Sequence, residues 1–169
     1  MKKPTVIVIC GPTASGKTAL SIELAKKIDG EVVSADSMQI YKDMNIGSAK
    51  VTPEEMKGIK HYLIDFVSPD ERYSVANYKQ DAKKAIKEIL ARGKTPIVVG
   101  GTGLYVDSLI YEIEYNNIEI DENYRKELED IKQNEGLEVL YKKALEIDSN
   151  AMKKISSNDS KRIMRVLEI

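Results

Sequence analysis

Residues 6–18 read VIVICGPTASGKT, an apolar run that leads directly into a glycine-containing loop. The last eight letters fit the pattern G-x-x-x-x-G-K-[ST] of a phosphate-binding loop, or P-loop, between a buried strand and a helix. The two glycines permit backbone angles at which successive N–H groups point into one concavity. Apolar residues at helical spacing follow the loop, which favours a P-loop over a chance match. We expect phosphate or pyrophosphate to bind Gly11, Pro12, Thr13, Ala14, Ser15, Gly16, Lys17 and Thr18.

Composition limits the classes of protein that the chain can belong to. Its 169 residues allow one domain, or one domain and part of a second. The formal net charge of −1 provides no global basic field, so any nucleic-acid contact must come from a local patch. A single cysteine, Cys10, fits a reducing compartment, and we expect it to be a small buried residue. No apolar run approaches the ~20 residues of a membrane span, so we expect a cytoplasmic protein without a membrane partner.

Strand and helix patterns alternate over residues 1–113, which predicts an α/β fold. The predicted class is a P-loop NTPase-like parallel sheet flanked by helices. Thr52-Pro53-Glu54-Glu55 has the form of a helix start with a capping box, and Ser74 opens a long amphipathic helix. We expect strands at about residues 5–10, 31–35, 62–67 and 95–99.

The character of the sequence changes after this core. Residues 114–152 are rich in charges and carry two helical patterns, which predicts a helical insertion outside the sheet. Residues 153–169 are expected to form a helix that returns to the core. That helical pattern is still running at Ile169, so we expect the chain to be cut within a larger protein.

The segment Ser34-Ala35-Asp36-Ser37-Met38-Gln39 follows the second predicted strand. We expect it at the carboxyl edge of the sheet beside the P-loop, because ligands of such sheets bind at that edge. Asp36 could take a proton from an acceptor held next to a bound phosphate. Alternatively, Asp36 or Ser37 could simply cap a helix. Position alone leaves these two interpretations open.

Three glycines surround Thr102 in Gly100-Gly101-Thr102-Gly103, at the end of the fourth predicted strand. Such a cluster indicates either close backbone approach or a tight strand-to-helix turn. The same glycines leave no acid at this strand end, where nucleotide hydrolases usually hold magnesium through water. The loop is therefore not expected to serve nucleotide hydrolysis.

Two further features have ordinary explanations. His61 is the only histidine, so we expect a structural hydrogen-bonding residue rather than a catalyst. Lysines and arginines cluster near the end of the chain, where either a solvated helix face or a contact with a phosphate backbone would account for them.

Several sequence blocks together resemble the tRNA dimethylallyltransferase family, also called tRNA isopentenyltransferases. The shared P-loop is common to many families, whereas the ADSMQIY block with GGTGLY is far more specific. The blocks span nearly the whole chain in order; they are GPTASGKT at 11–18, SADSMQIYKDMNIGSAK at 34–50, HYLID at 61–65, YSVANYKQDA at 73–82, GGTGLY at 100–105 and NDSKRIMRVLE at 158–168.

This resemblance implies transfer of a dimethylallyl group from dimethylallyl diphosphate to N6 of an adenosine beside the tRNA anticodon, with release of pyrophosphate. It implies that Lys17 neutralises the leaving group, that Thr18 ligates Mg²⁺, and that Asp36 handles the adenine amino group. Thr102 is implied as a third catalytic residue. The 114–152 segment is implied to face tRNA. The residues implied to contact tRNA are Asp36, Ser37, Met38, Gln39, Thr102, Arg125, Lys161, Arg162, Ile163, Met164 and Arg165.

The chain departs from the family pattern at positions peripheral to this chemistry. Ser48 and Val51 stand where the family commonly has threonine and proline, and Asp43 and Asn45 replace a common glycine and aspartate. The larger departure is length, because family chains continue well past this point. The present chain could therefore fold, or bind diphosphate, without being a competent enzyme.

Two other functions remain to be weighed against this one. A small-molecule or nucleoside kinase would place ATP in the loop and use Asp36 to activate a hydroxyl. A noncatalytic nucleotide-binding module is the third class, since any polyphosphate suits such a loop. We expect a monomer that binds tRNA and dimethylallyl diphosphate.

Overall fold

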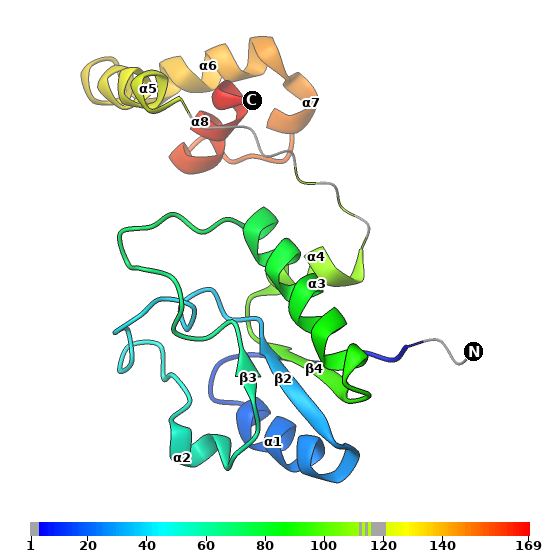
Figure 1. Ribbon diagram of the computed structural model, residues 1–169. Helices are drawn as coiled ribbons and strands as arrows, with labels where there is room; N and C mark the ends of the chain where they lie inside the picture. Colours follow the sequence, from blue (N-terminus) through cyan, green and yellow to red (C-terminus); the bar gives the residue numbers. More distant parts are fainter. Residues whose placement is uncertain (1–3, 112, 114, 116–120) are drawn as a thin grey trace. The chain divides into compact units, whose positions relative to one another are not determined.

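The computed structural model describes residues 4–111, 113, 115 and 121–169. The chain divides into two compact units, Met1–Asn116 and Asn117–Ile169. Figure 1 shows the sheet in the first unit and a group of helices in the second. We expected the α/β core to end at residue 113 and the helical segment to begin at residue 114. Residue 114 is not among the described residues, so this boundary stays a prediction.

The first unit is built on a parallel four-stranded sheet. The strands are β1 (Ile7–Cys10), β2 (Gly30–Ser34), β3 (His61–Tyr62) and β4 (Thr95–Gly100), in the order β1-β4-β2-β3. The neighbour of the P-loop strand is thus β4, and β2 lies one strand further away than the sequence analysis expected. Since β1 is the edge strand among the described residues, Cys10 at its end is exposed rather than buried.

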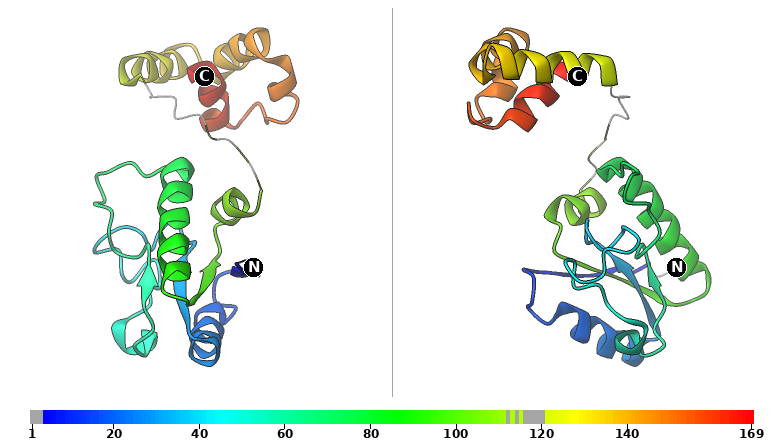
Figure 2. Two further views of the ribbon diagram at one scale, coloured as in Figure 1. Left: turned by 45° about the vertical axis from the view of Figure 1, so that its right-hand side comes forward. Right: turned by 90° about the vertical axis from the view of Figure 1, so that its left-hand side faces the viewer.

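Helices cover both faces of this sheet. On one face α1 (Lys17–Ile28) packs on Val32 and Ile97, and on the other face α3 (Val75–Ala91) and α4 (Gly103–Ile110) pack on Val33 and Val98. Figure 2 shows α1 and α3 on opposite sides of the strands. Consecutive residues of each strand therefore enter different cores, as the period of two along a strand requires. This explains why consecutive residues in the middle of the buried strands are apolar, Val32-Val33 in β2 and Ile97-Val98-Val99 in β4, instead of alternating with polar ones.

Two predicted helix starts are confirmed. Thr52 caps α2 (Pro53–Met56) and Ser74 caps α3, each through a complete capping box. The predicted strand at 62–67 is wrong beyond Tyr62, because Leu63 and Asp65 both have a φ of 59°. This left-handed backbone cannot continue a strand. The chain instead turns back to bond with the segment after β2, where Asp65 N donates to Gln39 O at 3.0 Å.

The second unit is a small helical bundle with its own core. It contains α5 (Glu122–Asn134), α6 (Leu137–Ile147), α7 (Ser149–Met152) and α8 (Ser160–Glu168). The helical patterns expected within 114–152 are thus present. The segment 153–169 was expected to return to the sheet, but α8 shares a core with the other helices of this unit. That core consists of Leu128, Leu140, Ala144, Met152, Ile163, Met164 and Leu167.

None of the helices in the described residues is long and apolar enough to cross a membrane.

Candidate functional site: a P-loop cleft and a basic helix pair

The P-loop has two left-handed residues, as expected, but they are Ala14 and Gly16; Gly11 has no positive φ, so the expectation for that glycine is wrong. Ala14 and Gly16 have φ values of 62° and 80°, and Gly16 is the N-cap residue of α1. Left-handed angles inside a short loop turn successive N–H groups toward one side. The first turn of α1 adds unpaired N–H groups and the positive end of its dipole. The loop therefore forms a site suited to an anion.

Lys17, the first residue of α1, folds back over this loop. Its Nζ donates to Pro12 O at 2.5 Å and to Ser15 Oγ at 3.3 Å, and the side chain stays exposed. The ammonium group is thus held above the loop, where it adds a full positive charge to the N–H groups. Thr18 follows on the helix and lines the adjacent cleft.

Gly100, the last residue of β4, lies close to the chain after β2, and Gly101 lies close to the P-loop. A Cβ on Gly100 would lie 2.0 Å from Ala35 O, and one on Gly101 would lie 3.3 Å from Gly11 O. Neither glycine has a positive φ, so close approach, and not a special turn, explains them. Because β4 lies between β1 and β2, Gly100 and Gly101 place no side chain between the P-loop and the end of β2, and both residues line the cleft there. Asp36 can therefore face the P-loop although their strands are not neighbours.

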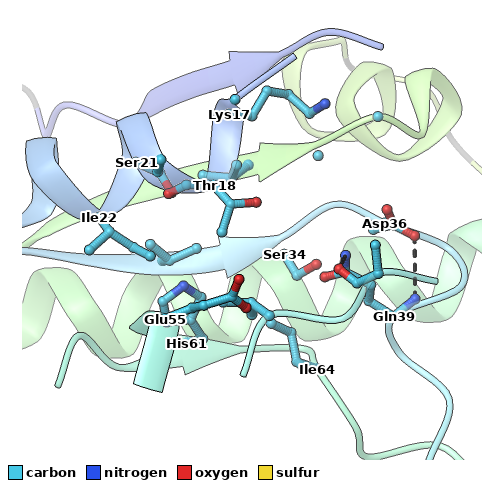
Figure 3. Close-up of a pocket in the computed structure, with 18 of the residues that line it drawn as sticks. Lys17, Thr18, Ser21, Ile22, Ser34, Asp36, Gln39, Glu55, His61 and Ile64 are labelled. Atoms are coloured by element: carbon cyan, nitrogen blue, oxygen red, sulfur yellow. Dashed lines mark hydrogen bonds between the residues drawn. The ribbon is translucent and has the colours of Figure 1, made fainter. Parts of the chain in front are cut away.

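Asp36 follows β2 and combines a structural contact with a position in the cleft. Its Oδ1 accepts hydrogen bonds from Met38 N at 2.9 Å and from Gln39 N at 3.3 Å, the second of which is dashed in Figure 3. These bonds fix the carboxylate relative to the backbone, and they leave Oδ2 for other partners. Residues 37–40 form a turn and not a helix, so the expected helix cap is wrong; Asp36 closes this turn instead, which is compatible with a chemical role for the second oxygen.

Thr102 acts on the same segment from the end of β4. Its Oγ1 accepts a hydrogen bond from Ser37 N at 2.9 Å and donates one to Ser37 Oγ at 3.2 Å. Thr102 N donates to Ala35 O at 3.1 Å. The residue thus links the loops after β4 and β2, and holds Ser37 beside Asp36.

Tyr105, on α4, packs beneath this link. It is buried and stacks on Tyr78 of α3, with ring centroids 4.0 Å apart. Burial, assisted by the nearby Tyr41 and Asp36, raises the pKa of Tyr105 to about 12. The tyrosine is therefore neutral at physiological pH, and it adds no charge beside the aspartate.

The segment between β2 and α2 is held down by two polar side chains. Gln39 Nε2 donates to Ser48 O and Ala49 O, each at 3.2 Å. Lys50, whose side chain is 6% exposed, binds both Tyr41 O and Asp65 Oδ1 at 2.6 Å. The Lys50 ammonium keeps the pKa of Asp65 below its usual value. Asp65 therefore stabilises the conformation of this backbone segment.

These residues surround a cleft of about 530 Å³. In Figure 3, Thr18, Ser21 and Ile22 of α1 form one wall, and Glu55, His61 and Ile64 form the opposite one. Residues 13–18 of the P-loop, Asp36 and Gln39 line the same cleft, whereas Gly11 and Pro12 do not. Ser37, Met38 and Thr102 do not line it, although Thr102 and Ser37 are bonded to each other.

His61 contributes a feature that sequence reasoning missed. Its Nδ1 lies 2.8 Å from Ile59 O, and because a carbonyl only accepts, Nδ1 must carry the proton. Nε2 therefore has a free lone pair; it is buried and has no hydrogen-bond partner among the described residues. Burial lowers the pKa of the ring, so the neutral form prevails at pH 7. The cleft thus contains a buried acceptor.

The other predicted RNA-contacting residues lie in the helical unit. Arg125 of α5 and Arg165 of α8 are joined through one carboxylate, that of Glu168. Lys161 and Arg162 are exposed on α8, whereas Ile163 and Met164 are buried in the helical core. The exposed charge of the predicted stretch therefore comes from its three basic residues.

Comparison with known proteins identifies the family. A family model described as IPP transferase matches residues 39–169. The chain belongs to the IPP transferase family. This family member is 56% identical over 164 residues to the tRNA dimethylallyltransferase of Acetivibrio thermocellus, a match that covers 97% of the chain and 52% of the relative. The tRNA dimethylallyltransferase of Thermoanaerobacter sp. is 49% identical with the same coverage.

Solved structures of this family have the same fold. The full-length tRNA isopentenylpyrophosphate transferase from Bacillus halodurans is 46% identical, with a TM-score of 0.66 over 98% of the chain and 55% of that protein. A eukaryotic dimethylallyltransferase acting on tRNA is 37% identical, with a TM-score of 0.81 over 99% of the chain and 41% of that protein. The P-loop-like α/β fold is therefore confirmed. The chain spans about half the length of the curated relatives that it matches.

Proposed function

We propose that this chain is the diphosphate-binding part of a tRNA dimethylallyltransferase. Such an enzyme transfers the dimethylallyl group of dimethylallyl diphosphate to N6 of an adenosine next to the tRNA anticodon. The observation that carries the proposal is that P-loop residues 13–18 and Asp36 line one cleft, together with Gly100 and Gly101 at the carboxyl end of the intervening strand β4. The names of the similar proteins support the same reaction rather than a kinase.

The reaction requires one bond to break and one to form. The C–O bond between the dimethylallyl group and the diphosphate breaks, N6 bonds to the freed carbon, and the N6 proton leaves. The loop N–H groups and Lys17 stabilise the negative charge that develops on the departing pyrophosphate. Asp36 orients the amino group and accepts its proton, with the carboxylate held in place by Met38 N and Gln39 N.

Magnesium fits this site if it arrives with the diphosphate. No group of three or more histidine, cysteine or acidic side chains that could hold a metal occurs in the part of the chain that is described. Mg²⁺ commonly uses few protein ligands and binds substrate phosphates and water instead. We assign the Thr18 hydroxyl in the cleft as its protein ligand. When bound, the ion would neutralise part of the charge on the pyrophosphate.

The RNA is assigned to two groups of residues. In the first unit, Asp36–Gln39 and Thr102 would receive the target nucleotide, turned out of any stack so that N6 is accessible. In the second unit, Arg125, Lys161, Arg162 and Arg165 would contact the phosphate backbone, which dominates affinity for nucleic acids; Ile163 and Met164 lie in the helical core and would only anchor α8. Thr102 would act by holding Ser37 and the adjacent Asp36 segment.

We infer a monomer in the cytoplasm, where unmodified tRNA is available.

The proposal is tested by supplying alternative donors. The protein, extended to the full length of its relatives, is incubated with unmodified tRNA and either labelled dimethylallyl diphosphate or labelled ATP. We expect label in tRNA from the prenyl donor only. If the protein consumed ATP with a small acceptor and no tRNA became labelled, the transferase proposal would be rejected in favour of a kinase. The Lys17→Ala variant should bind the prenyl diphosphate more weakly, and an unchanged dissociation constant would contradict the loop assignment.

A further inference from the structure

Glu168, at the end of α8, is a buried carboxylate shared by two arginines. Its side chain is 2% exposed. Oε1 lies 2.8 Å from Nε of Arg125 on α5, and Oε2 lies 3.1 Å from Nη1 of Arg165 on α8. Oε1 accepts no well-aligned hydrogen bond, so Arg125 and Oε1 interact as an ion pair only. Each oxygen thus faces one guanidinium group.

Both arginines remain accessible while Glu168 is covered. The side chains of Arg125 and Arg165 are 32% and 37% exposed. Each contact uses one of the three guanidinium nitrogens, which leaves two per side chain for other acceptors. One buried negative charge and two partly exposed positive charges leave a net charge of +1 at this point. The guanidinium groups of this cluster are therefore accessible to solvent, whereas the carboxylate is not.

The helix carries further positive charge beside this cluster. Lys161 lies four residues before Arg165 and seven before Glu168, so the three share one face of α8. The opposite face is anchored by Ile163, Met164 and Leu167 in the helical core. The positions of the basic side chains are consequently tied to the packing of α8.

We propose that Glu168 is a positioning residue that fixes Arg125 and Arg165 as a pair for binding phosphates of an RNA backbone. This inference rests on the proposed function, since it takes tRNA as the partner. Glu168 itself is too buried to touch the RNA. It restricts two long, flexible side chains before binding, which lowers the entropy that binding would otherwise cost. An alternative is that the pair simply ties α5 to α8.

Charge and positioning act in opposite directions when Glu168 is changed, which makes the test sharp. Glu168→Gln removes one negative charge, so overall electrostatics would tighten RNA binding. Loss of positioning would weaken it. The matched control is Glu138→Gln, because Glu138 is an exposed residue of α6 that pairs with Lys142 and contributes the same charge. Both variants raise the net charge by the same amount, and only one disturbs the arginine pair.

The measurement is the dissociation constant of an anticodon stem-loop RNA at several salt concentrations. We expect Glu138→Gln to bind at least as tightly as the wild type, and Glu168→Gln to bind at least about fivefold more weakly at about 0.1 M salt. Arg125→Ala and Arg165→Ala should each reduce the slope of log K against log salt by ~1, as the loss of one phosphate contact requires. These two variants keep the test valid if Glu168→Gln does not fold.

Each outcome has a separate meaning. If Glu168 only ties α5 to α8, Glu168→Gln should melt at a lower temperature than the wild type. The folded Glu168→Gln variant should then bind RNA as tightly as Glu138→Gln does. That result would overturn the positioning role and leave the proposed function untouched. Unchanged salt slopes for both arginine variants would also overturn the positioning role. If the wild-type protein does not bind the stem-loop at all, the RNA partner of the proposed function fails, and the inference fails with it.

Discussion

At the scale of single residues, Asp36 has two roles that one substitution can separate. The Asp36→Asn variant would keep an oxygen to accept from Met38 N and Gln39 N, but it would lose the basic carboxylate. We therefore expect Asp36→Asn to reduce transfer to tRNA about 100-fold or more. Binding of dimethylallyl diphosphate should be nearly unchanged. Single-turnover kinetics with labelled donor and a direct binding measurement would distinguish these two effects.

The control for this experiment is Asp36→Ala, which removes both the carboxylate and the acceptor of the turn. It should lose stability as well as transfer, because Met38 N and Gln39 N lose a hydrogen-bond partner, at a cost of about 1 kcal/mol. If Asp36→Asn lowered transfer less than tenfold, the carboxylate would not be the proton acceptor.

His61 gives a prediction about pH. The folded protein holds the pKa of this ring below its usual value because the ring is buried. At a pH below about 6.5 the unfolded chain binds a proton that the folded one rejects, so stability must fall as the pH decreases through this range. His61→Gln should lose less stability between pH 7 and pH 5 than the wild type. Denaturant melts at both pH values measure the difference, and equal losses would show that His61 is not responsible.

At the scale of elements, the approach of β4 to β2 depends on Gly100. An alanine there would place its Cβ 2.0 Å from Ala35 O, which is backbone and has little freedom to move. We expect Gly100→Ala to lower the free energy of unfolding by about 3 kcal/mol. Gly103→Ala is the matched control, since its Cβ would meet nothing within 4 Å at the start of α4. Equal urea midpoints for the two variants would contradict this account.

The segment between β2 and α2 gives a second prediction at this scale. Lys50 binds Tyr41 O and Asp65 Oδ1, so Lys50→Met would leave both without their buried cation. We expect amide protons of residues 39–50 to exchange at least about tenfold faster, because the local opening free energy falls by more than about 1.4 kcal/mol. Lys26→Met is the control, because Lys26 pairs with the exposed Glu23. Equal exchange in both variants would show that Lys50 does not hold the segment.

The elements also show which parts of the fold a sequence reveals. Capping boxes at Thr52 and Ser74 are local patterns, and both helix starts were predicted correctly. The end of β3 depends on left-handed angles at Leu63 and Asp65, residue types that do not announce such angles. The position of β4 between β1 and β2 depends on pairing between segments far apart in the chain, which no local pattern encodes.

The same distinction applies to the candidate site. The P-loop is a contiguous motif, so its position between β1 and α1 was predicted from sequence, although one left-handed angle lies at Ala14 and not at Gly11. The structural hydrogen bond expected of His61 is confirmed, but its buried, unpaired Nε2 and the role of Glu168 were missed, because both depend on burial and on partners elsewhere in the fold. A single histidine or a glutamate in a helix has no local signal of that kind. Cys10 was predicted to be buried, and its exposure follows from the edge position of β1.

At the scale of the whole molecule, the two units have separate hydrophobic cores. Leu140 is fully buried in the helical core, and Leu140→Ala should destabilise that unit by about 3 kcal/mol. We expect diphosphate binding by the first unit to stay within about twofold of the wild type, whereas stem-loop RNA binding should fall. Hydrogen exchange of each unit, together with both binding measurements, checks this. A large loss of diphosphate affinity would show that the units are energetically coupled.

The bond from Lys17 Nζ to Pro12 O sets a threshold for any ion that enters the loop. An incoming ligand must compete with a carbonyl oxygen that already lies against the ammonium group. A halide or nitrate offers a single diffuse charge and gains little from the exchange. A diphosphate offers several oxygens at once, which take over the ammonium and the loop N–H groups together. We therefore expect the loop to bind a diphosphate more tightly than it binds chloride or nitrate.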